Sequence, residues 1–162
     1  MGVVHTMIAN SLYLASKYSR RDELREVAKR LDTYGIKITS SWLAENYSLN
    51  VAMKDIDVNT HQELAKTDLD DIVRANGFLF FAEDQNAQPP RGSRHVEFGY
   101  ALAQGLQMYV IGEPENIFHH LPNVHCYPTL DAFFEEEFTY EHPKVGGSES
   151  RLGETAALAN IA

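Results

Sequence analysis

Hydrophobic and polar positions along the chain fall into two alternating patterns. Short apolar runs, typical of buried strands, are separated by segments whose apolar residues recur at helical spacing. The strongest run, residues 77–82, reads Gly-Phe-Leu-Phe-Phe-Ala, and its continuous hydrophobicity is typical of a central parallel strand covered on both faces. The predicted strands are residues 11–15, 36–41, 77–82, 108–111 and 124–126.

Helical patterns separate these strands. The first helix is expected to begin with Ser19 as its N-cap, and the second with Asn59 or Thr60. The third begins at Gly92 or Ser93. Further helical segments are predicted at residues 115–120 and 130–138, and residues 42–57 predict an irregular, partly helical lid.

Strands that alternate with helices predict a parallel sheet with right-handed crossovers. We therefore expect a flavodoxin-like three-layer α/β/α fold with a five-stranded sheet in the order 2-1-3-4-5. In that order a ligand crevice opens at the carboxyl ends of the first and third strands. Residues 11–140 would form this single domain, with a loose leader at residues 1–10 and a flexible tail at residues 141–162.

Composition restricts the possible partners. A chain of 162 residues fits one domain. The net charge of −9, from 23 acidic and 14 basic residues, disfavours binding to a nucleic-acid polymer. Cys126 is the single cysteine, which favours a reducing compartment. With no secretory signal and no long apolar run, we expect a cytoplasmic protein that does not bind membranes.

Glu97 is the first candidate for chemistry. It lies about one turn into the third predicted helix, next to the crevice, and the nearby Gly99 and Ala101 predict close packing there. The positive helix end, with Arg91 and Arg94, is expected to favour its ionised form. An ionised, positioned carboxylate suits a nucleophile that attacks a sugar carbon. The alternative is a surface glutamate that supports the helix start.

A second acidic group, Asp68, Asp70 and Asp71, precedes the third strand. If the side chain of one of these aspartates points towards Glu97, the two carboxyls lie close together. Two neighbouring carboxylates cannot both ionise freely, so the pKa of one rises and that group becomes a proton donor. The alternative is a solvated acidic face of the helix.

The two loops at the crevice are basic and polar. Both lead into helix N-termini, whose free backbone amides bind phosphate. The first loop reads Ser-Lys-Tyr-Ser-Arg-Arg and contains no glycine, so it is neither a P-loop, a dinucleotide fingerprint nor a flavin-phosphate loop. It predicts a pocket for a small anion, and helix capping is the alternative. The predicted substrate- and phosphate-binding residues are Ser16, Lys17, Ser19, Arg20, Gly92, Ser93 and Arg94.

Other side chains carry weaker signals. His95, His119 and His125 could together bind a metal, but no motif such as H-E-x-x-H supports them. We expect neither a metal nor a cofactor. Trp42 and Tyr47 could stack on a base, or they could simply pack in the core or lid.

Taken together, residues 11–138 resemble the nucleoside 2-deoxyribosyltransferase family, which includes the 2′-deoxynucleoside 5′-monophosphate N-hydrolases. The resemblance depends on Leu-Tyr-Leu-Ala-Ser at 12–16, Asp-Leu at 68–69 and His-Val-Glu-Phe-Gly-Tyr-Ala at 95–101. The family pattern is an aromatic residue followed by Glu-Leu-Gly-x-Ala. Here valine replaces the aromatic residue and phenylalanine the leucine, whereas the Glu, Gly and Ala remain.

The resemblance implies roles for individual residues. Glu97 would be the nucleophile that forms a glycosyl-enzyme intermediate, Asp68 would assist proton transfer to the departing base, and Tyr13 would hydrogen-bond near the nucleophile. Family members commonly complete each site with a neighbouring subunit, so we expect a homo-oligomer, with residues 116–123 as the candidate contact. Phosphate contacts in the monophosphate-hydrolysing branch would fall at Ser16, Arg20, Gly92 and Ser93.

The implied activity is cleavage of the N-glycosidic bond of a 2′-deoxynucleoside or its 5′-monophosphate, with transfer to a second base or to water. Three other classes stay open. One is a non-catalytic sensor of a nucleotide derivative, and another is a flavodoxin-type electron carrier. A response-regulator receiver is disfavoured, because the first strand ends in Ala15-Ser16 without the acidic pair that binds magnesium.

Overall fold

The computed structural model describes residues 8–45, 55–84 and 92–138, which form a five-stranded parallel sheet in the order β2-β1-β3-β4-β5. The predicted strand order and the flavodoxin-like fold class are therefore confirmed. Most of the predicted leader, the tail at residues 141–162, Tyr47 and Arg91 lie outside the described residues. The strands are β1 (Ser11–Ala15), β2 (Lys37–Ile38), β3 (Gly77–Phe81), β4 (Gln107–Ile111) and β5 (Val124–Tyr127).

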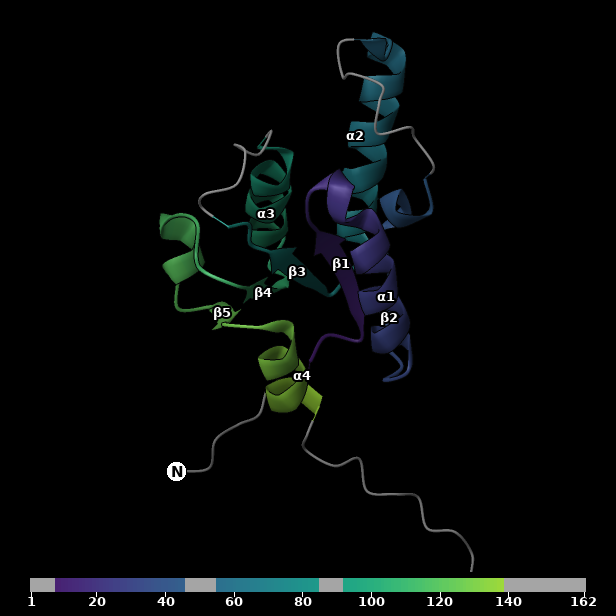
Figure 1. Ribbon diagram of the computed structural model, residues 1–162. Coiled ribbons are helices and arrows are strands. Elements are labelled where there is room, and N and C mark those ends of the chain that lie inside the picture. The colour runs from purple at the N-terminus through teal and green to yellow at the C-terminus, as the bar shows by residue number, and fades with distance from the viewer. Residues whose placement is uncertain (1–7, 46–54, 85–91, 139–162) are drawn as a thin grey trace, which may run out of the picture.

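Helices cover both faces of the sheet, with α3 and α4 on opposite sides (Figure 1). On one face α2 contacts α3. On the other, α1 is joined to α4 by an ion pair of 2.9 Å between Arg30 and Asp131. No helix in the described part of the chain combines the length and the apolar character that crossing a membrane requires. The helices are α1 (Arg21–Asp32), α2 (Val58–Val73), α3 (Ser93–Ala103) and α4 (Leu130–Phe138), with short 3-10 turns η1 (Tyr18–Arg20), η2 (Ser41–Ala44) and η4 (Ile117–His120).

The two central strands are fully buried, as their continuous apolar sequences predict. Tyr13 of β1 stacks on Phe78 of β3, with ring centroids 5.4 Å apart. Phe98 of α3 meets the Phe78 ring edge-on at 6.0 Å. This aromatic contact places the Tyr13 side chain on the sheet face that α2 and α3 cover.

Two predicted helix caps were wrong. Ser19 lies within η1, and Arg20 occupies the N-cap of α1 without a side-chain cap. Asp57, not Asn59 or Thr60, caps α2, because its carboxylate accepts a hydrogen bond from the Thr60 amide at 3.1 Å. An aspartate at the N-cap suits the positive end of the helix, and the two residues proposed from the sequence lie inside the first turn.

Strand β2 is shorter than predicted, because the chain beyond Ile38 leaves the regular ladder. The Thr39 amide still donates to the Leu12 carbonyl at 3.0 Å. One residue further, the Ser40 hydroxyl takes over and accepts from the Leu14 amide at 2.6 Å. A side chain thus replaces the backbone at the end of β1, immediately before η2 begins.

Candidate functional site

Tyr13 of β1, Asp68 of α2 and Glu97 of α3 come together between the sheet and its α2–α3 face. Their electrostatic effects on one another show the proximity. The charge of Asp68 raises the pKa of Glu97, and both carboxylates raise the pKa of Tyr13. The Tyr13 hydroxyl in turn lowers the pKa of both carboxyls. The structure therefore places the three predicted catalytic residues in one cluster.

Packing of α3 on the sheet positions Glu97. Its neighbour Phe98 is buried against Phe78, and Ala101 is fully buried one turn later. These two contacts fix which face of the helix turns inward. Gly99 is different: it is exposed and has open space around it, so close packing at that position was a wrong expectation.

The ionisation of Glu97 differs from the sequence prediction. Burial, followed by the charge of Asp68, raises the pKa of this carboxyl to about 8. The opposing influence of Arg94 is weaker, since the Arg94 guanidinium binds Glu115 at 2.6 and 2.8 Å. Arg94 favours the ionised form of Glu97, as the sequence predicted, but desolvation and the charge of Asp68 outweigh this effect.

Asp68 also binds its proton more tightly than a free aspartate. Burial, then the charges of Glu45 and Asp71, raise its pKa to about 6. A raised pKa in this acidic group was expected, but that of Glu97 is higher still. Because the two carboxyls interact, they titrate as a pair. Near neutral pH the ligand-free pair therefore holds about one proton, and the higher pKa of Glu97 favours that carboxyl as its site.

The hydroxyl of Tyr13 is buried and makes no hydrogen bond of standard geometry with the described residues. Burial and the two neighbouring carboxylates raise its pKa, so the side chain stays a phenol that can donate a proton. The two carboxyls nevertheless lie close enough for this hydroxyl to lower their pKa values, so its donor points at the pair. A ligand oxygen, or a carboxylate after a small rotation, would satisfy it.

The three clustered aspartates have three different environments. Asp70 is exposed. Asp71 is fully buried and accepts hydrogen bonds from the Ser41 amide at 2.7 Å and the Ser41 hydroxyl at 2.6 Å, and it also pairs with Arg74. Asp71 thus ties α2 to η2. Of the three, Asp68 is the one that acts on Glu97.

The cations of the loop after β1 are already paired with carboxylates. Lys17 Nζ lies 3.0 Å from Glu83 Oε2, and Arg20 Nη1 lies 3.4 Å from Glu83 Oε1. Arg20 also binds Glu23 at 2.7 Å. Ser16 lies in the same loop, and its buried hydroxyl has no hydrogen-bond partner among the described residues. The neighbouring Ser19 is exposed.

At the start of α3, Arg94 is buried and connects this helix to the end of β3 and to the segment that follows β4. Besides its two bonds to Glu115, it donates to the Phe81 carbonyl at 3.2 Å. Gly92 is the N-cap of α3 and has a φ of 82°, which favours glycine, and Ser93 is exposed beside it. Gly92 and Ser93 thus form the helix N-terminus expected of an anion pocket, whereas the Arg94 guanidinium is committed to Glu115.

Sequence reasoning missed Glu83 and Glu115. Each follows a strand closely, Glu83 after β3 and Glu115 after β4, and the Glu83 amide donates to Glu115 Oε1 at 2.6 Å. Acidic residues at strand ends beside two basic loops were the available signal. Their pairing depends on loop geometry that the sequence pattern does not give.

The histidines form no metal centre: the described ranges hold no cluster of three or more His, Cys, Asp or Glu residues arranged to bind an ion. His119 is buried, and burial lowers its pKa to about 4. Asn116 bridges it to His95, with 3.3 Å to a ring nitrogen of each. His125 is exposed on β5. These contacts join η4 to α3.

Trp42 has a structural role. Its side chain is buried, its indole nitrogen donates to the Leu14 carbonyl at 2.9 Å, and its ring lies 6.3 Å from that of Tyr18. The sequence left open whether Trp42 stacks on a base or packs in the protein, and the structure shows it packed.

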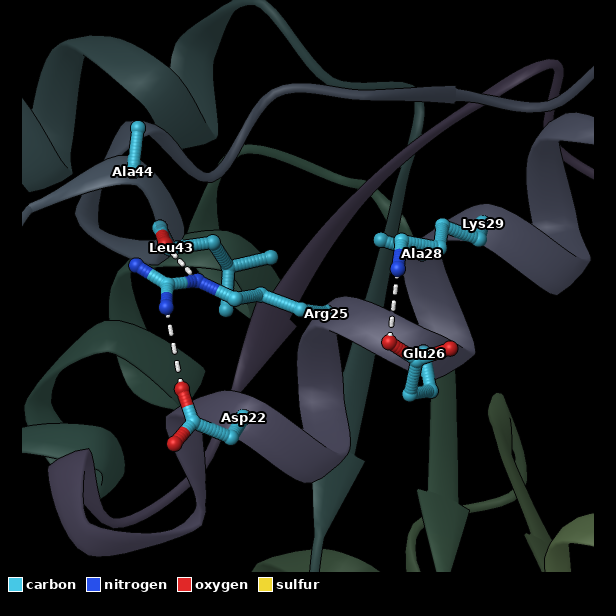
Figure 2. Close-up of a pocket in the computed structure, with 7 residues that line it drawn as sticks. All are labelled: Asp22, Arg25, Glu26, Ala28, Lys29, Leu43 and Ala44. Atoms are coloured by element: carbon cyan, nitrogen blue, oxygen red, sulfur yellow. Dashed lines mark hydrogen bonds and ion pairs between the residues drawn. The ribbon is translucent and has the colours of Figure 1, made fainter.

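A hollow of about 510 Å³ lies between α1 and η2, away from the predicted site (Figure 2). Arg25 crosses it, donating to the Leu43 carbonyl at 2.6 Å and to Asp22 at 2.9 Å. None of the predicted site residues lines it. Its lining residues are Asp22, Arg25, Glu26, Ala28, Lys29, Leu43 and Ala44.

Comparison with known proteins gives little beyond this geometry. No family model matches the chain, and no curated protein sequence matches it. Among solved structures, the chain is similar to the Clostridium botulinum CMP N-glycosidase BcmB, with 20% sequence identity and a TM-score of 0.49 over 78% of this chain and 96% of that one. The likeness is weak in both sequence and backbone.

Proposed function

We propose that this protein cleaves the N-glycosidic bond of a nucleoside or nucleoside 5′-monophosphate, with Glu97 as nucleophile and Asp68 as proton donor. The observation that carries the proposal is the partly buried Asp68–Glu97 pair beside Tyr13, whose two raised pKa values keep one proton between two carboxyls near neutral pH. The resemblance of the motifs at 12–16, 68–69 and 95–101 to the nucleoside 2-deoxyribosyltransferase family supports it.

The chemistry needs one ionised and one protonated carboxyl. The Glu97 carboxylate attacks C1′ of the sugar while the C1′–N bond breaks, and the bonding electrons leave with the base, which takes a proton from Asp68. Water, or a second base, then attacks C1′, gives its proton to Asp68 and releases Glu97. Two displacements at C1′ retain the configuration of the sugar, as in retaining glycosidases.

The ligand-free pair is one proton transfer away from this arrangement. It holds the correct number of protons, but the proton is on Glu97 rather than on Asp68. A ligand that displaces solvent from Asp68, while the Tyr13 hydroxyl hydrogen-bonds the Glu97 carboxylate, would favour transfer of the proton from Glu97 to Asp68. In this proposal, substrate binding creates the nucleophile and the acid together.

The crevice loops would hold the rest of the substrate. Gly92 and Ser93 offer backbone amides and a hydroxyl at the start of α3, and Ser16 offers a buried hydroxyl that is free to pair. We assign this pocket to the 5′ end of the sugar. Lys17, Ser19, Arg20 and Arg94 remain predicted members of its wall.

The test is a product assay on a panel of nucleosides and their 5′-monophosphates, with and without a second free base. Wild type should release the base from at least one member of the panel, and Glu97→Gln should release none above background. Glu113→Gln, which alters an exposed glutamate outside the site, is the matched control and should keep wild-type rates. Equal rates in wild type and Glu97→Gln would refute the mechanism.

A second candidate is a non-catalytic domain that binds a nucleotide derivative in the same crevice. The observation that favours it is the proton on Glu97, since a neutral carboxyl is a poor nucleophile. In that case no panel member would turn over, and Glu97→Gln would keep the ligand affinity of wild type. The same assay, combined with a binding titration, separates the two functions.

A further inference from the structure

We propose that Glu83 is a specificity-determining residue, whose carboxylate occupies the anion position of the crevice and selects an unphosphorylated nucleoside over its 5′-monophosphate. This inference rests on the proposed function of the same site. It concerns which of the two substrate classes enters, and it depends on ion pairs that the sequence did not reveal.

The carboxylate of Glu83 bridges the two cations that a phosphate would need. One oxygen lies 3.0 Å from Lys17 Nζ and the other 3.4 Å from Arg20 Nη1. A phosphate bound by this loop would engage the same two donors with its own oxygens. Glu83 therefore already makes the contacts that the anion would make.

Glu83 also lies deeper than its partners. Its side chain is 12% exposed, against 23% for Lys17 and 27% for Arg20. Its backbone is held as well: the Glu83 amide donates to Glu115 at 2.6 Å, and the preceding carbonyl, of Ala82, accepts from Arg20 at 3.2 Å. The carboxylate is thus built into the end of β3 and is not a mobile surface group.

The described charges in this cluster of ion pairs cancel. Lys17 and Arg20 contribute two positive charges, and Glu83 and Glu23 contribute two negative ones. A phosphate would add negative charge to a cluster whose two cations, among the described residues, are already matched by two carboxylates. It would have to displace Glu83 into a partly buried position without a partner, which is costly for a carboxylate.

A 5′-hydroxyl would not have to displace Glu83 from its two cations. It can donate a hydrogen bond to a Glu83 oxygen and accept one from the Lys17 ammonium. The pocket that repels a phosphate therefore has both a donor and an acceptor for an alcohol. This complementarity indicates an unphosphorylated nucleoside as the substrate class.

The experiment is a calorimetric titration of wild type, Glu83→Gln and the control Glu113→Gln with a 2′-deoxynucleoside and with its 5′-monophosphate. Wild type and the control should bind the nucleoside at least tenfold more tightly than the monophosphate. Glu83→Gln removes the negative charge that Lys17 and Arg20 share, so its affinity for the monophosphate should rise at least tenfold while its affinity for the nucleoside changes less than threefold.

Tighter binding of the monophosphate than of the nucleoside by wild type would overturn the proposal, and this result needs no variant. A Glu83→Gln variant that binds the monophosphate no better than wild type would also overturn it. Each titration is repeated in the Glu97→Gln background, which should not release the base, so that the affinities are measured without turnover. The expected affinities without base release would refute the glycosidic mechanism and leave the selectivity intact. Base release from the monophosphate in preference to the nucleoside would support the glycosidic mechanism and refute the selectivity.

Discussion

Glu83 and Glu115 each lie within 3.4 Å of a lysine or arginine nitrogen, whereas Asp68 of α2 and Glu97 of α3 make no ion pair with any described residue. Both regions are partly or largely buried, so the difference does not come from solvent. Paired charges keep a loop in place. Two neighbouring carboxyls without a cation destabilise each other's ionised form. Such arrangements are found mainly at functional sites.

The largest effect should come from Asp68. In Asp68→Asn the departing base loses its proton donor, so kcat should fall by about 100-fold or more, the range typical of general acid catalysis. The loss should be smaller for bases that leave easily without protonation. Steady-state rates on a pair of such substrates measure the difference, and Asp70→Asn, two residues away on the exposed surface, should match wild type. An equal loss on both substrates would contradict the role as acid.

The pH dependence should show both members of the pair. Below about pH 6 both carboxyls are protonated and no nucleophile exists, and above about pH 8 both are ionised and no acid exists. We therefore expect kcat/KM to be bell-shaped between these limbs, falling about tenfold per pH unit outside them. A rate that is constant from pH 5 to pH 9 would show that the pair does not control the reaction.

Removing the Glu115 carboxylate, which pairs with Arg94, should destabilise the fold. Glu115→Ala leaves the buried Arg94 guanidinium without its partner, which should lower the free energy of unfolding by about 3 kcal/mol. Glu113→Ala changes an exposed glutamate two residues earlier and should cost far less. Denaturant unfolding of both variants measures the difference, and similar midpoints would contradict the structural role of the pair.

Removing the Glu97 carboxylate, which has no cationic partner among the described residues, should instead raise the free energy of unfolding. The folded-state pKa of Glu97 is about 8, above its ordinary value of 4.5, so the folded chain binds this proton more tightly than the unfolded chain does. The free energy of unfolding therefore falls as the pH rises from about 4.5 to 8. Glu97→Gln removes the buried charge, and at pH 9 it should be more stable than wild type by about 2 kcal/mol.

At pH 4 the Glu97→Gln variant and wild type should melt at nearly the same temperature, because Glu97 is protonated in both the folded and much of the unfolded chain. Thermal melts at the two pH values measure the difference. A variant that is less stable than wild type at pH 9 would show that Glu97 has a partner in the folded state, and the contrast between the two regions would then fail.

The sheet could be predicted from the sequence because a buried strand has a distinctive apolar run. Residues 11–15 and 77–82 match β1 and β3 to within one residue. Helix caps were harder, since several polar residues near each start could act as the cap. At α2 the choice of Asp57 depends on the hydrogen bonds that its carboxylate accepts from the Thr60 amide and hydroxyl.

The carboxyl pair could be proposed from motifs, but its ionisation could not. The sequence shows that Arg94 is near Glu97, and it does not show that the guanidinium is committed to Glu115, a residue beyond the next strand. In the same way, Asp68 and Asp71 are three residues apart on one helix. Which of them meets Glu97 depends on where η2 places Ser41 against Asp71.

Trp42 offers a practical benefit that its packing role does not suggest. It is the single tryptophan of the chain, and its indole is anchored to the Leu14 carbonyl, two residues before the Ser16 loop. Its fluorescence therefore originates from one known place at the rim of the crevice. A change in emission on adding a nucleoside would follow occupancy in real time, in the unlabelled wild-type protein.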